Sequence, residues 1–179
     1  YKSPISSPHG PTVLNDGAVL WVGRIQGIHN HIEAHVINTE TGEMILRGDL
    51  ELYKYEEFKD IYFYEPHAIQ LPDGKIICHL RAENADESLF TLYQTVSLDN
   101  GVTWSKPKQI LKDDSGAPSH LFLHSSGALI AAFSHREMPY GIHVILSSDG
   151  GESWSDEYTI YQNFYTDDLG YPATTELDD

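Results

Sequence analysis

An eight-residue pattern occurs twice in the sequence and constrains the fold more than any other feature. Ser97–Trp104 reads SLDNGVTW and Ser147–Trp154 reads SSDGGESW, so both fit S-x-D-x-G-x-[ST]-W and begin 50 residues apart. A degenerate third copy, NTETGEM, has Glu40 and Gly42 where the Asp and the Gly stand. Matches at five fixed positions over such an interval indicate a repeat architecture, in which each repeat is one unit of a larger array.

A hairpin signature recurs at nearly the same interval. Gly17, Gly74 and Gly127 each stand in a short turn signal between two apolar runs, in VLNDGAVL, QLPDGKII and LHSSGALI. Glycine accepts the positive φ that tight hairpin turns require, so each stretch predicts two antiparallel strands. A proline recurs at a nearly constant distance before the hairpins, and we expect it to be the first residue of a strand, where its missing N–H costs no ladder bond. These prolines are Pro8, Pro66, Pro118 and Pro172.

Together the hairpins and the boxes give four antiparallel strands in roughly 50 residues, which is the make-up of a propeller blade. The sequence therefore predicts an all-β propeller with blades at approximately 7–60, 61–113 and 114–165, and the first strand of a fourth from 166. Helical periodicity is weak throughout. The apolar spacing of residues 50–64 is ambiguous, and we expect an outer strand and a connector there.

The boxes have a structural explanation. Their Asp accepts backbone N–H bonds within its own turn, their Gly supplies a left-handed conformation, and their Trp packs between sheets. Burying about 200 Å² of indole at about 25 cal/mol/Å² is worth up to roughly 5 kcal/mol. We therefore expect a structural role, not a catalytic one, for their fixed residues. These are Ser97, Asp99, Gly101, Trp104, Ser147, Asp149, Gly151 and Trp154.

The composition limits the partners. Lys and Arg number 11 and Asp and Glu number 27, so the net charge of −16 argues against nucleic acid or an anionic membrane as a broad electrostatic partner. No apolar run approaches the roughly 18 residues of a membrane span. The single cysteine, Cys78, lies in an expected buried strand and leaves no intrachain disulfide. We expect no cofactor and no metal; the alternative is that His29, His31 and His35 share one strand face and bind a metal.

The repeated box is similar to the Asp-box, or BNR repeat, of the sialidase (neuraminidase) superfamily. The resemblance extends to EPHAIQLPDGKII, PYGIHVILSSDGGESW and DLGYPATTELDD, and so covers nearly the whole chain. It implies a six-bladed β-propeller with a carbohydrate site on one face of the central axis, glycosidase activity that commonly releases terminal sialic acid, and a secreted or extracytoplasmic location. Six blades of about 50 residues need roughly 300 residues. We therefore expect a fragment, or self-association that closes a ring and covers the open sheet edges.

Arginine placement points to the loop-rich face of such a propeller, which ligand sites favour. Arg24 and Arg81 each lie seven residues after their hairpin glycine, and Arg136 lies nine residues after its own, so all three end the second strand of a repeat. Guanidinium groups bind carboxylates through two parallel hydrogen bonds, which makes these arginines candidate ligands of an acidic sugar. The alternative is that they pair with neighbouring Asp or Glu side chains.

The sequence departs from the sialidase pattern at one motif. Sialidases carry an Arg two residues before the first-strand proline, and the matching positions here are Ser6, Tyr64, Gly116 and Gly170. The arginine that anchors the carboxylate of sialic acid is therefore not found by motif.

Acid–base chemistry on a sugar needs a carboxyl group near the axis. Glu65, at an expected strand start, is the first candidate for the catalytic acid or base, with a salt bridge as its alternative role. The resemblance implies a tyrosine nucleophile activated by a glutamate, which Tyr171 would resemble; sugar stacking or packing explains it equally well. His67, placed like His9 and His120 just after a proline, is a candidate for binding sugar hydroxyls or for the base of a lyase, and the alternative is a core histidine. Further carboxyl candidates are Glu83, Asp86, Glu137, Asp167 and Asp168.

The sequence thus predicts a sialidase-like glycoside hydrolase that acts on a terminal, acidic sugar. Two alternatives stay open. One is a noncatalytic carbohydrate-binding propeller, and the other is a polysaccharide lyase on the same fold that uses His67 or a tyrosine. The boxes specify the fold far better than the reaction.

Overall fold

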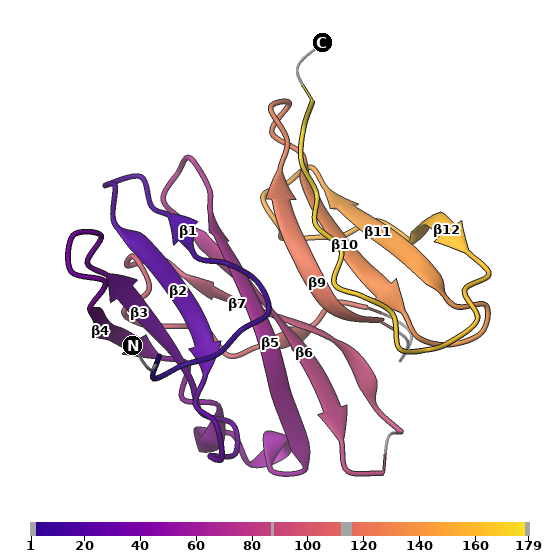
Figure 1. Ribbon diagram of the computed structural model, residues 1–179, viewed down its shortest axis with the longest axis horizontal. Coiled ribbons are helices and arrows are strands. Elements are labelled where there is room, and N and C mark those ends of the chain that lie inside the picture. Colours follow the sequence, from indigo (N-terminus) through magenta and orange to yellow (C-terminus); the bar gives the residue numbers. More distant parts are fainter. Residues whose placement is uncertain (1–2, 87, 112–115, 178–179) are drawn as a thin grey trace.

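The computed structural model describes residues 3–86, 88–111 and 116–177, and its strands form three four-stranded antiparallel sheets. The first sheet contains β1 (Thr12–Val13), β2 (Val19–Arg24), β3 (Ile32–Ile37) and β4 (Met44–Asp49). The second contains β5 (Ile61–Gln70), β6 (Ile76–Asn84), β7 (Phe90–Ser97) and β8 (Lys108–Gln109). The third contains β9 (Gly116–Leu123), β10 (Leu129–His135), β11 (Gly141–Ser147) and β12 (Tyr158–Gln162). Figure 1 shows the three sheets following one another in chain order.

Within each sheet the strands pair in the order of the chain, as the sequence predicts for a blade. The first two strands of each sheet are joined by turns in which Gly17, Gly74 and Gly127 have φ values of 84°, 93° and 87°. The third and fourth strands of the second and third sheets are joined by the two boxes. The all-β propeller fold is therefore confirmed, as three open sheets that fit an incomplete propeller.

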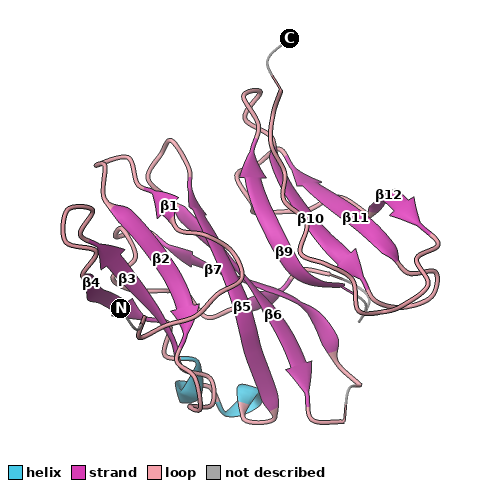
Figure 2. Cartoon of the chain, viewed as in Figure 1, coloured by secondary structure: helices cyan, strands magenta, loops and turns pink. Residues whose placement is uncertain are grey.

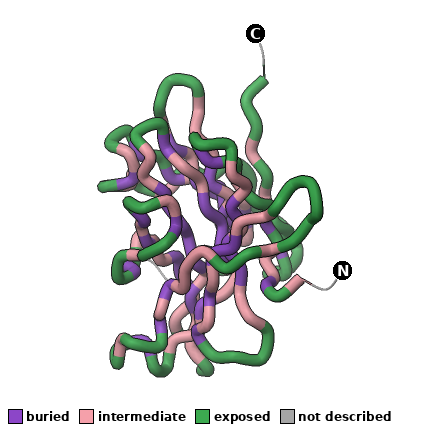
Figure 3. The backbone as a smooth tube through the Cα atoms, turned by 90° about the vertical axis from the view of Figure 1, so that its left-hand side faces the viewer, coloured by how far each residue is buried: buried purple, intermediate pink, exposed green. Residues whose placement is uncertain are grey.

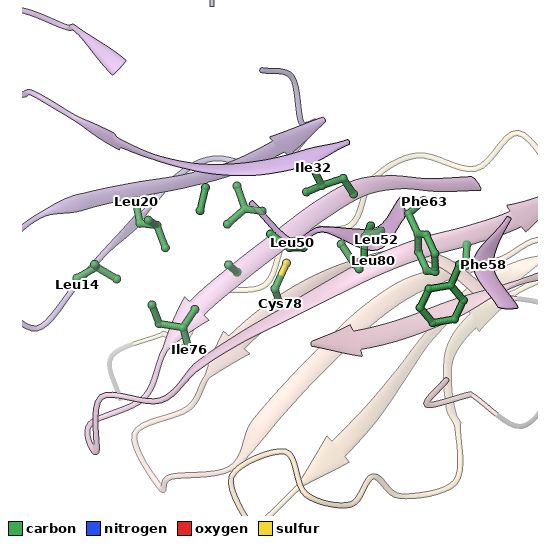
Figure 4. Close-up of a cluster of buried hydrophobic side chains, with 14 residues drawn as sticks. Leu14, Leu20, Ile32, Leu50, Leu52, Phe58, Phe63, Ile76, Cys78 and Leu80 are labelled. Atoms are coloured by element: carbon green, nitrogen blue, oxygen red, sulfur yellow. The ribbon is translucent and has the colours of Figure 1, made fainter. Parts of the chain in front are cut away.

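Two clusters of buried side chains hold neighbouring sheets together. The first joins the first and second sheets and includes Leu20, Ile32 and Phe63, and Figure 4 shows these side chains directed into one apolar layer. The second joins the second and third sheets, with Ile77 and Phe133 fully buried. Exposed residues gather in the turns and loops, as Figure 3 shows, so the ends of the sheets are the parts open to a ligand.

The two boxes have the same hydrogen bonds around their aspartate. Asp99 accepts bonds from the Thr103 hydroxyl at 2.6 Å, the Thr103 N–H at 2.8 Å and the Ser97 hydroxyl at 2.8 Å, and these bonds lower the pKa of Asp99. Asp149 accepts the corresponding bonds from Ser147 at 2.7 Å and Ser153 at 3.0 Å. The indoles of the two boxes extend the clusters between the sheets: Trp104 packs against the first and Trp154 against the second.

The connector between the first two sheets differs from the sequence prediction. The outer strand ends at Asp49, and two 3₁₀ turns, η1 (Leu52–Lys54) and η2 (Glu56–Phe58), precede β5; Figure 2 shows them in cyan. The predicted outer strand over residues 50–64 is therefore wrong. The short turns bury Leu52 and Phe58 in the first core cluster, which explains the ambiguous apolar spacing.

The prediction that each proline begins a strand is wrong. Pro8 lies in a bend before β1 begins at Thr12, and Pro172 lies in the segment after β12 that forms no ladder. Pro66 lies inside the ten residues of β5, and Pro118 is the third residue of β9. Both fall where the pairing shifts register, between Tyr64 and His67 in β5 and opposite Phe133–His135 in β9. A bulge of this kind leaves a residue out of the ladder, so a missing N–H is tolerated there.

The last described residues run beside the third sheet without forming a ladder, as the yellow segment in Figure 1 shows. The Ser134 hydroxyl donates to the Gly170 carbonyl at 2.6 Å, and the Thr174 N–H donates to His120 Nδ1 at 3.2 Å. The predicted blade boundary between residues 113 and 114 lies outside the described residues. None of the helical segments in the described ranges is long and apolar enough to cross a lipid bilayer.

Candidate active site

Three of the four arginines alternate with two aromatic rings across the three sheets. The Arg24 guanidinium lies 4.3 Å from the ring centre of Tyr64, and that of Arg81 lies 5.4 Å from the same ring. Arg81 also lies 4.8 Å from the ring of Phe90, which Arg136 approaches to 5.7 Å. Each cation–π contact contributes about 0.5–1 kcal/mol at an exposed site and more when it is desolvated. We call Arg24, Tyr64, Arg81, Phe90 and Arg136 the arginine row.

Glu65 reaches this row through the bulge in β5. Its φ is +50°, a left-handed conformation that costs a non-glycine residue of order 1 kcal/mol. The bulge interrupts the alternation of side chains between Tyr64 and His67, so it decides where the Glu65 carboxylate points. Strained residues of this kind cluster at functional sites, which makes Glu65 a candidate on backbone grounds as well.

Glu65 uses both carboxylate oxygens. The Tyr171 hydroxyl donates to Oε1 at 2.6 Å, and Arg81 Nη1 donates to Oε2 at 2.9 Å. Arg81 also donates to Glu83. The structure thus brings together Glu65 and Tyr171, which come from β5 and from the segment that follows the third sheet. It also gives Glu65 the salt bridge that the sequence left open as an alternative.

The hydrogen bond with Glu65, with a contribution from burial, raises the pKa of Tyr171 above its ordinary value. Burial disfavours the charged form of Arg81, but its hydrogen bonds and charge interactions with Glu65 and Glu83 outweigh this and raise its pKa. At neutral pH the phenol therefore keeps its proton and presents it to Glu65, while Arg81 stays charged.

Two cavities border the row and share Tyr64. The smaller, about 310 Å³, is the one that Tyr171 and Glu65 line. Its other lining residues are Ser6, Ser7, Pro8, Arg24 and Tyr64. The larger cavity, about 620 Å³, is lined by aromatic, basic and acidic groups from the second and third sheets. They include Tyr62, Tyr64, Arg81, Phe90, Arg136, Glu137 and Asp167.

The three arginines differ in how many of their hydrogen-bond donors are already paired within the described part of the chain. Arg81 is paired with two carboxylates, and Arg136 Nη2 donates to the Leu169 carbonyl at 3.2 Å. Within the described part of the chain, the Arg24 guanidinium has only its contact with the Tyr64 ring. Arg24 is therefore the arginine with the most unused hydrogen-bonding capacity toward a ligand anion.

The histidines that follow the prolines form a stack beside this site. His67 lies with its ring centre 4.8 Å from that of His9 and 4.6 Å from that of His120. Burial, and then the neighbouring histidines, lower the pKa of His67 to about 2, and burial lowers that of His9 to about 4. His67 Nδ1 accepts the Leu121 N–H at 2.8 Å, so this ring is neutral and bonded to backbone.

The three histidines of HNHIEAH have different neighbours. The Glu33 carboxylate lies 3.1 Å from His31 Nε2 and 2.7 Å from His35 Nε2. The His29 ring instead packs on that of Tyr62, with 4.6 Å between ring centres. The three therefore do not form one set of ligands.

Sequence reasoning gave no site role to Tyr64 and Phe90, the rings of the row. Tyr64 is the cross-strand partner of Arg81, and Phe90 pairs with Glu83, two residues further along β6. Only the register of the paired strands, which the sequence does not give, shows that these two rings lie beside the arginines.

The domain family described as BNR repeat-like matches residues 4–179. The chain belongs to the BNR repeat-like family. The prediction of a BNR-repeat protein is thereby confirmed. A comparison with curated protein sequences finds no significant match.

Solved structures show the same fold at low sequence identity. A protein of unknown function from Dyadobacter fermentans has a TM-score of 0.80 and 17% identity over 96% of this chain and 46% of its own. The α-L-arabinofuranosidase of Fusarium graminearum has a TM-score of 0.68 and 14% identity over 90% and 50%. The Hadza microbial sialidase Hz136 has a TM-score of 0.58 and 20% identity over 81% and 35%. This BNR repeat-like chain spans half or less of the length of these structures.

Proposed function

We propose that this chain carries part of the active site of a glycoside hydrolase that acts on a terminal, acidic sugar. The observation that carries the proposal is the Tyr171 hydroxyl, 2.6 Å from Glu65 in a cavity that Arg24 also lines. A phenol, a carboxylate that takes its proton and a cation with unused donors supply a nucleophile, a base and an anion-binding group in one place.

In the proposed reaction the Tyr171 oxygen attacks the anomeric carbon while its proton passes to Glu65. The glycosidic C–O bond breaks, and the leaving oxygen takes a proton from a carboxylic acid, for which Glu137 and Asp167 of the adjoining cavity are candidates. Water then attacks the anomeric carbon and gives its proton to the carboxylate that had acted as the acid. The Tyr171 oxygen leaves and recovers its proton from Glu65. Arg81 keeps Glu65 oriented throughout.

The arginine row supports an acidic substrate. Ser6 occupies one of the positions where sialidases have an arginine, and its cross-strand partner is Arg24. Tyr64 occupies another, and its partner is Arg81. At both positions the neighbouring strand thus supplies the guanidinium that the motif lacks. Because bidentate arginine contacts favour carboxylates, this arrangement supports a sugar acid over a neutral pentose or hexose.

The two alternatives rest on less. A lyase needs a base that reaches the substrate, and His67 is buried, neutral and bonded to backbone. A purely sugar-binding propeller would use the same arginines and aromatic rings, but the strained Glu65 and its short bond from Tyr171 give it no advantage.

The test is a panel of aryl glycosides of sialic acid, a hexuronic acid, arabinofuranose and galactose, offered to the protein that carries this chain. We expect turnover of an acidic glycoside with release of a reducing sugar. Binding without turnover would indicate a lectin, and an unsaturated, ultraviolet-absorbing product from a polysaccharide would indicate a lyase. Turnover of the neutral glycosides alone would contradict the acidic substrate.

A further inference from the structure

We infer that His135, His143 and Glu157 form a divalent transition-metal site in the third sheet, of the class that Zn²⁺ occupies. The residues come from three places: the last residue of β10, the third residue of β11 and the residue before β12. One ligand atom from each of the three lies within 4.8 Å of the other two, the only such group found in the described ranges.

The geometry is close to what a metal needs. His143 Nδ1 lies 2.8 Å from Glu157 Oε2, and His135 Nδ1 lies 3.7 Å from the same oxygen. The two imidazole rings are stacked, with 4.3 Å between centres and 14° between planes. Zinc binds nitrogen and oxygen ligands at about 2.0–2.2 Å, so its ligand atoms lie roughly 3.4 Å apart. The two distances to Glu157 Oε2 bracket this spacing, so small side-chain movements would bring all three ligands onto one ion.

The backbone makes room for the stacked rings. Gly141 is the cross-strand partner of His135, and a Cβ at that position would lie 2.4 Å from the Tyr161 carbonyl oxygen and 3.3 Å from His143 Nε2. The pairing of β11 with β12 shifts register between Ile142 and His143, and a bulge of this kind redirects a side chain. Gly141 and the bulge together let the His143 ring lie over that of His135.

The surroundings of the three residues supply a hydrogen-bond partner for His143 and an opening to water. The Thr159 hydroxyl lies 3.4 Å from His143 Nε2, where an N–H···O bond leaves the Nδ1 lone pair for a metal. His143 is 11% exposed, against 16% for His135 and 23% for Glu157, so one side of the group is open to water. Water would complete a tetrahedral shell.

Such an ion would have a structural use. All five residues of β12 are exposed, so little apolar burial holds this outer strand to the sheet. A metal that joins the end of β10, β11 and the residue before β12 would fix it in place, since binding to the folded form alone stabilises that form. The site does not involve the arginine row, so the inference is independent of the proposed function.

The experiment uses the chain freed of metal with a chelator, titrated with Zn²⁺ by calorimetry. We expect saturable binding of one ion per chain and a higher temperature of unfolding with Zn²⁺. Glu157→Gln and His143→Ala should each weaken binding by about tenfold or more. The visible absorption of bound Co²⁺ should show a four-coordinate shell of nitrogen and oxygen ligands. If the three residues only pack against one another and bind no metal, no such spectrum should appear.

His124→Ala is the matched control, because His124 Nε2 pairs with Glu176 at 3.0 Å without a second imidazole. This variant should bind Zn²⁺ like the wild-type chain. Absence of saturable binding, or equal affinity in Glu157→Gln and in the wild type, overturns the inference. If His143→Ala does not fold, Glu157→Gln and Thr159→Val carry the test, because both nearly preserve side-chain shape.

Discussion

The phenol oxygen of Tyr171 lies 2.6 Å from Oε1 of Glu65, although 106 residues separate the two in the chain. A bulge in β5 and a hydrogen bond from Arg81 hold Glu65 in place. Tyr171 belongs to the segment that a hydrogen bond from Ser134 ties to the third sheet. The pair therefore exists only when the second sheet and that segment are both in place, and it belongs to the tertiary structure.

We predict that Tyr171→Phe lowers kcat by about 10²- to 10⁴-fold, the usual contribution of a positioned proton-transfer group, while substrate binding stays within a few-fold. Glu65→Gln should have a similar effect, because the amide cannot take the proton. Steady-state kinetics with an aryl glycoside measures kcat, and calorimetry with the product sugar measures binding. Tyr165→Phe, at a fully exposed position, is the control. Unchanged kcat in Tyr171→Phe would falsify the assignment.

Arg24→Ala should raise KM for an acidic glycoside by about tenfold or more, since a hydrogen bond to a charged group is worth about 1.5–3 kcal/mol. The KM for a neutral glycoside should change much less, because the lost contact is with the carboxylate. Arg24→Lys should recover only part of the loss, since lysine lacks the planar fork. Arg47→Ala, the remaining arginine, lies in outer strand β4 and should leave both values unchanged. Equal effects on both glycosides would mean that Arg24 acts through packing.

Much of the fold was predictable because its signals are local. The hairpin glycines and the boxes each act within a few residues, and their regular interval revealed the four-stranded unit. The placement of Pro66 was not predictable, because the bulge depends on how β5 pairs with β6. The turns over Leu52 and Phe58 were missed for a related reason, since those side chains fill a core between two sheets.

The candidate site, like the fold, was predictable only in part. From the interval between hairpin glycine and arginine we expected Arg24, Arg81 and Arg136 to end the second strand of each repeat. Only Arg24 does so, because Arg81 lies within β6 and Arg136 follows β10. The partners of those arginines depend on cross-strand register and on contacts between sheets, as the shared rings of Tyr64 and Phe90 show. A sequence without known pairing carries no such information.

The box aspartates give the fold a defined sensitivity to acid. The Ser153 side chain and N–H and the Ser147 hydroxyl lower the pKa of Asp149 below its ordinary value of 3.8. A carboxylate with a lowered folded-state pKa stabilises the fold fully above pH 3.8, and this stabilisation is lost as pH falls through the folded-state value. We predict that Asp149→Asn unfolds at a lower temperature than the wild type at neutral pH, with a difference that narrows below pH 3.8.

Thermal unfolding followed by circular dichroism across this pH range checks the prediction. Asp73→Asn is a suitable control, because Asp73 accepts a single backbone bond, from Lys75 at 3.0 Å, in a hairpin turn. A difference between Asp149→Asn and the wild type that stays constant with pH would show that the charge of Asp149 plays no part.

Gly48 of β4 lies close to the box of the second sheet. A Cβ at this position would lie 2.4 Å from the carbonyl oxygens of both Gly101 and Val102, and backbone atoms at the edge of a hydrogen-bonded turn have little room to move. We predict that Gly48→Ala destabilises the chain by about 1–3 kcal/mol, the usual range for overpacking, or by more if the two sheets separate. Gly10→Ala meets no atom within 4 Å and should change stability by less than about 0.5 kcal/mol. Urea unfolding of both variants measures the difference, and equal midpoints would mean that the box of one sheet does not rest on its neighbour.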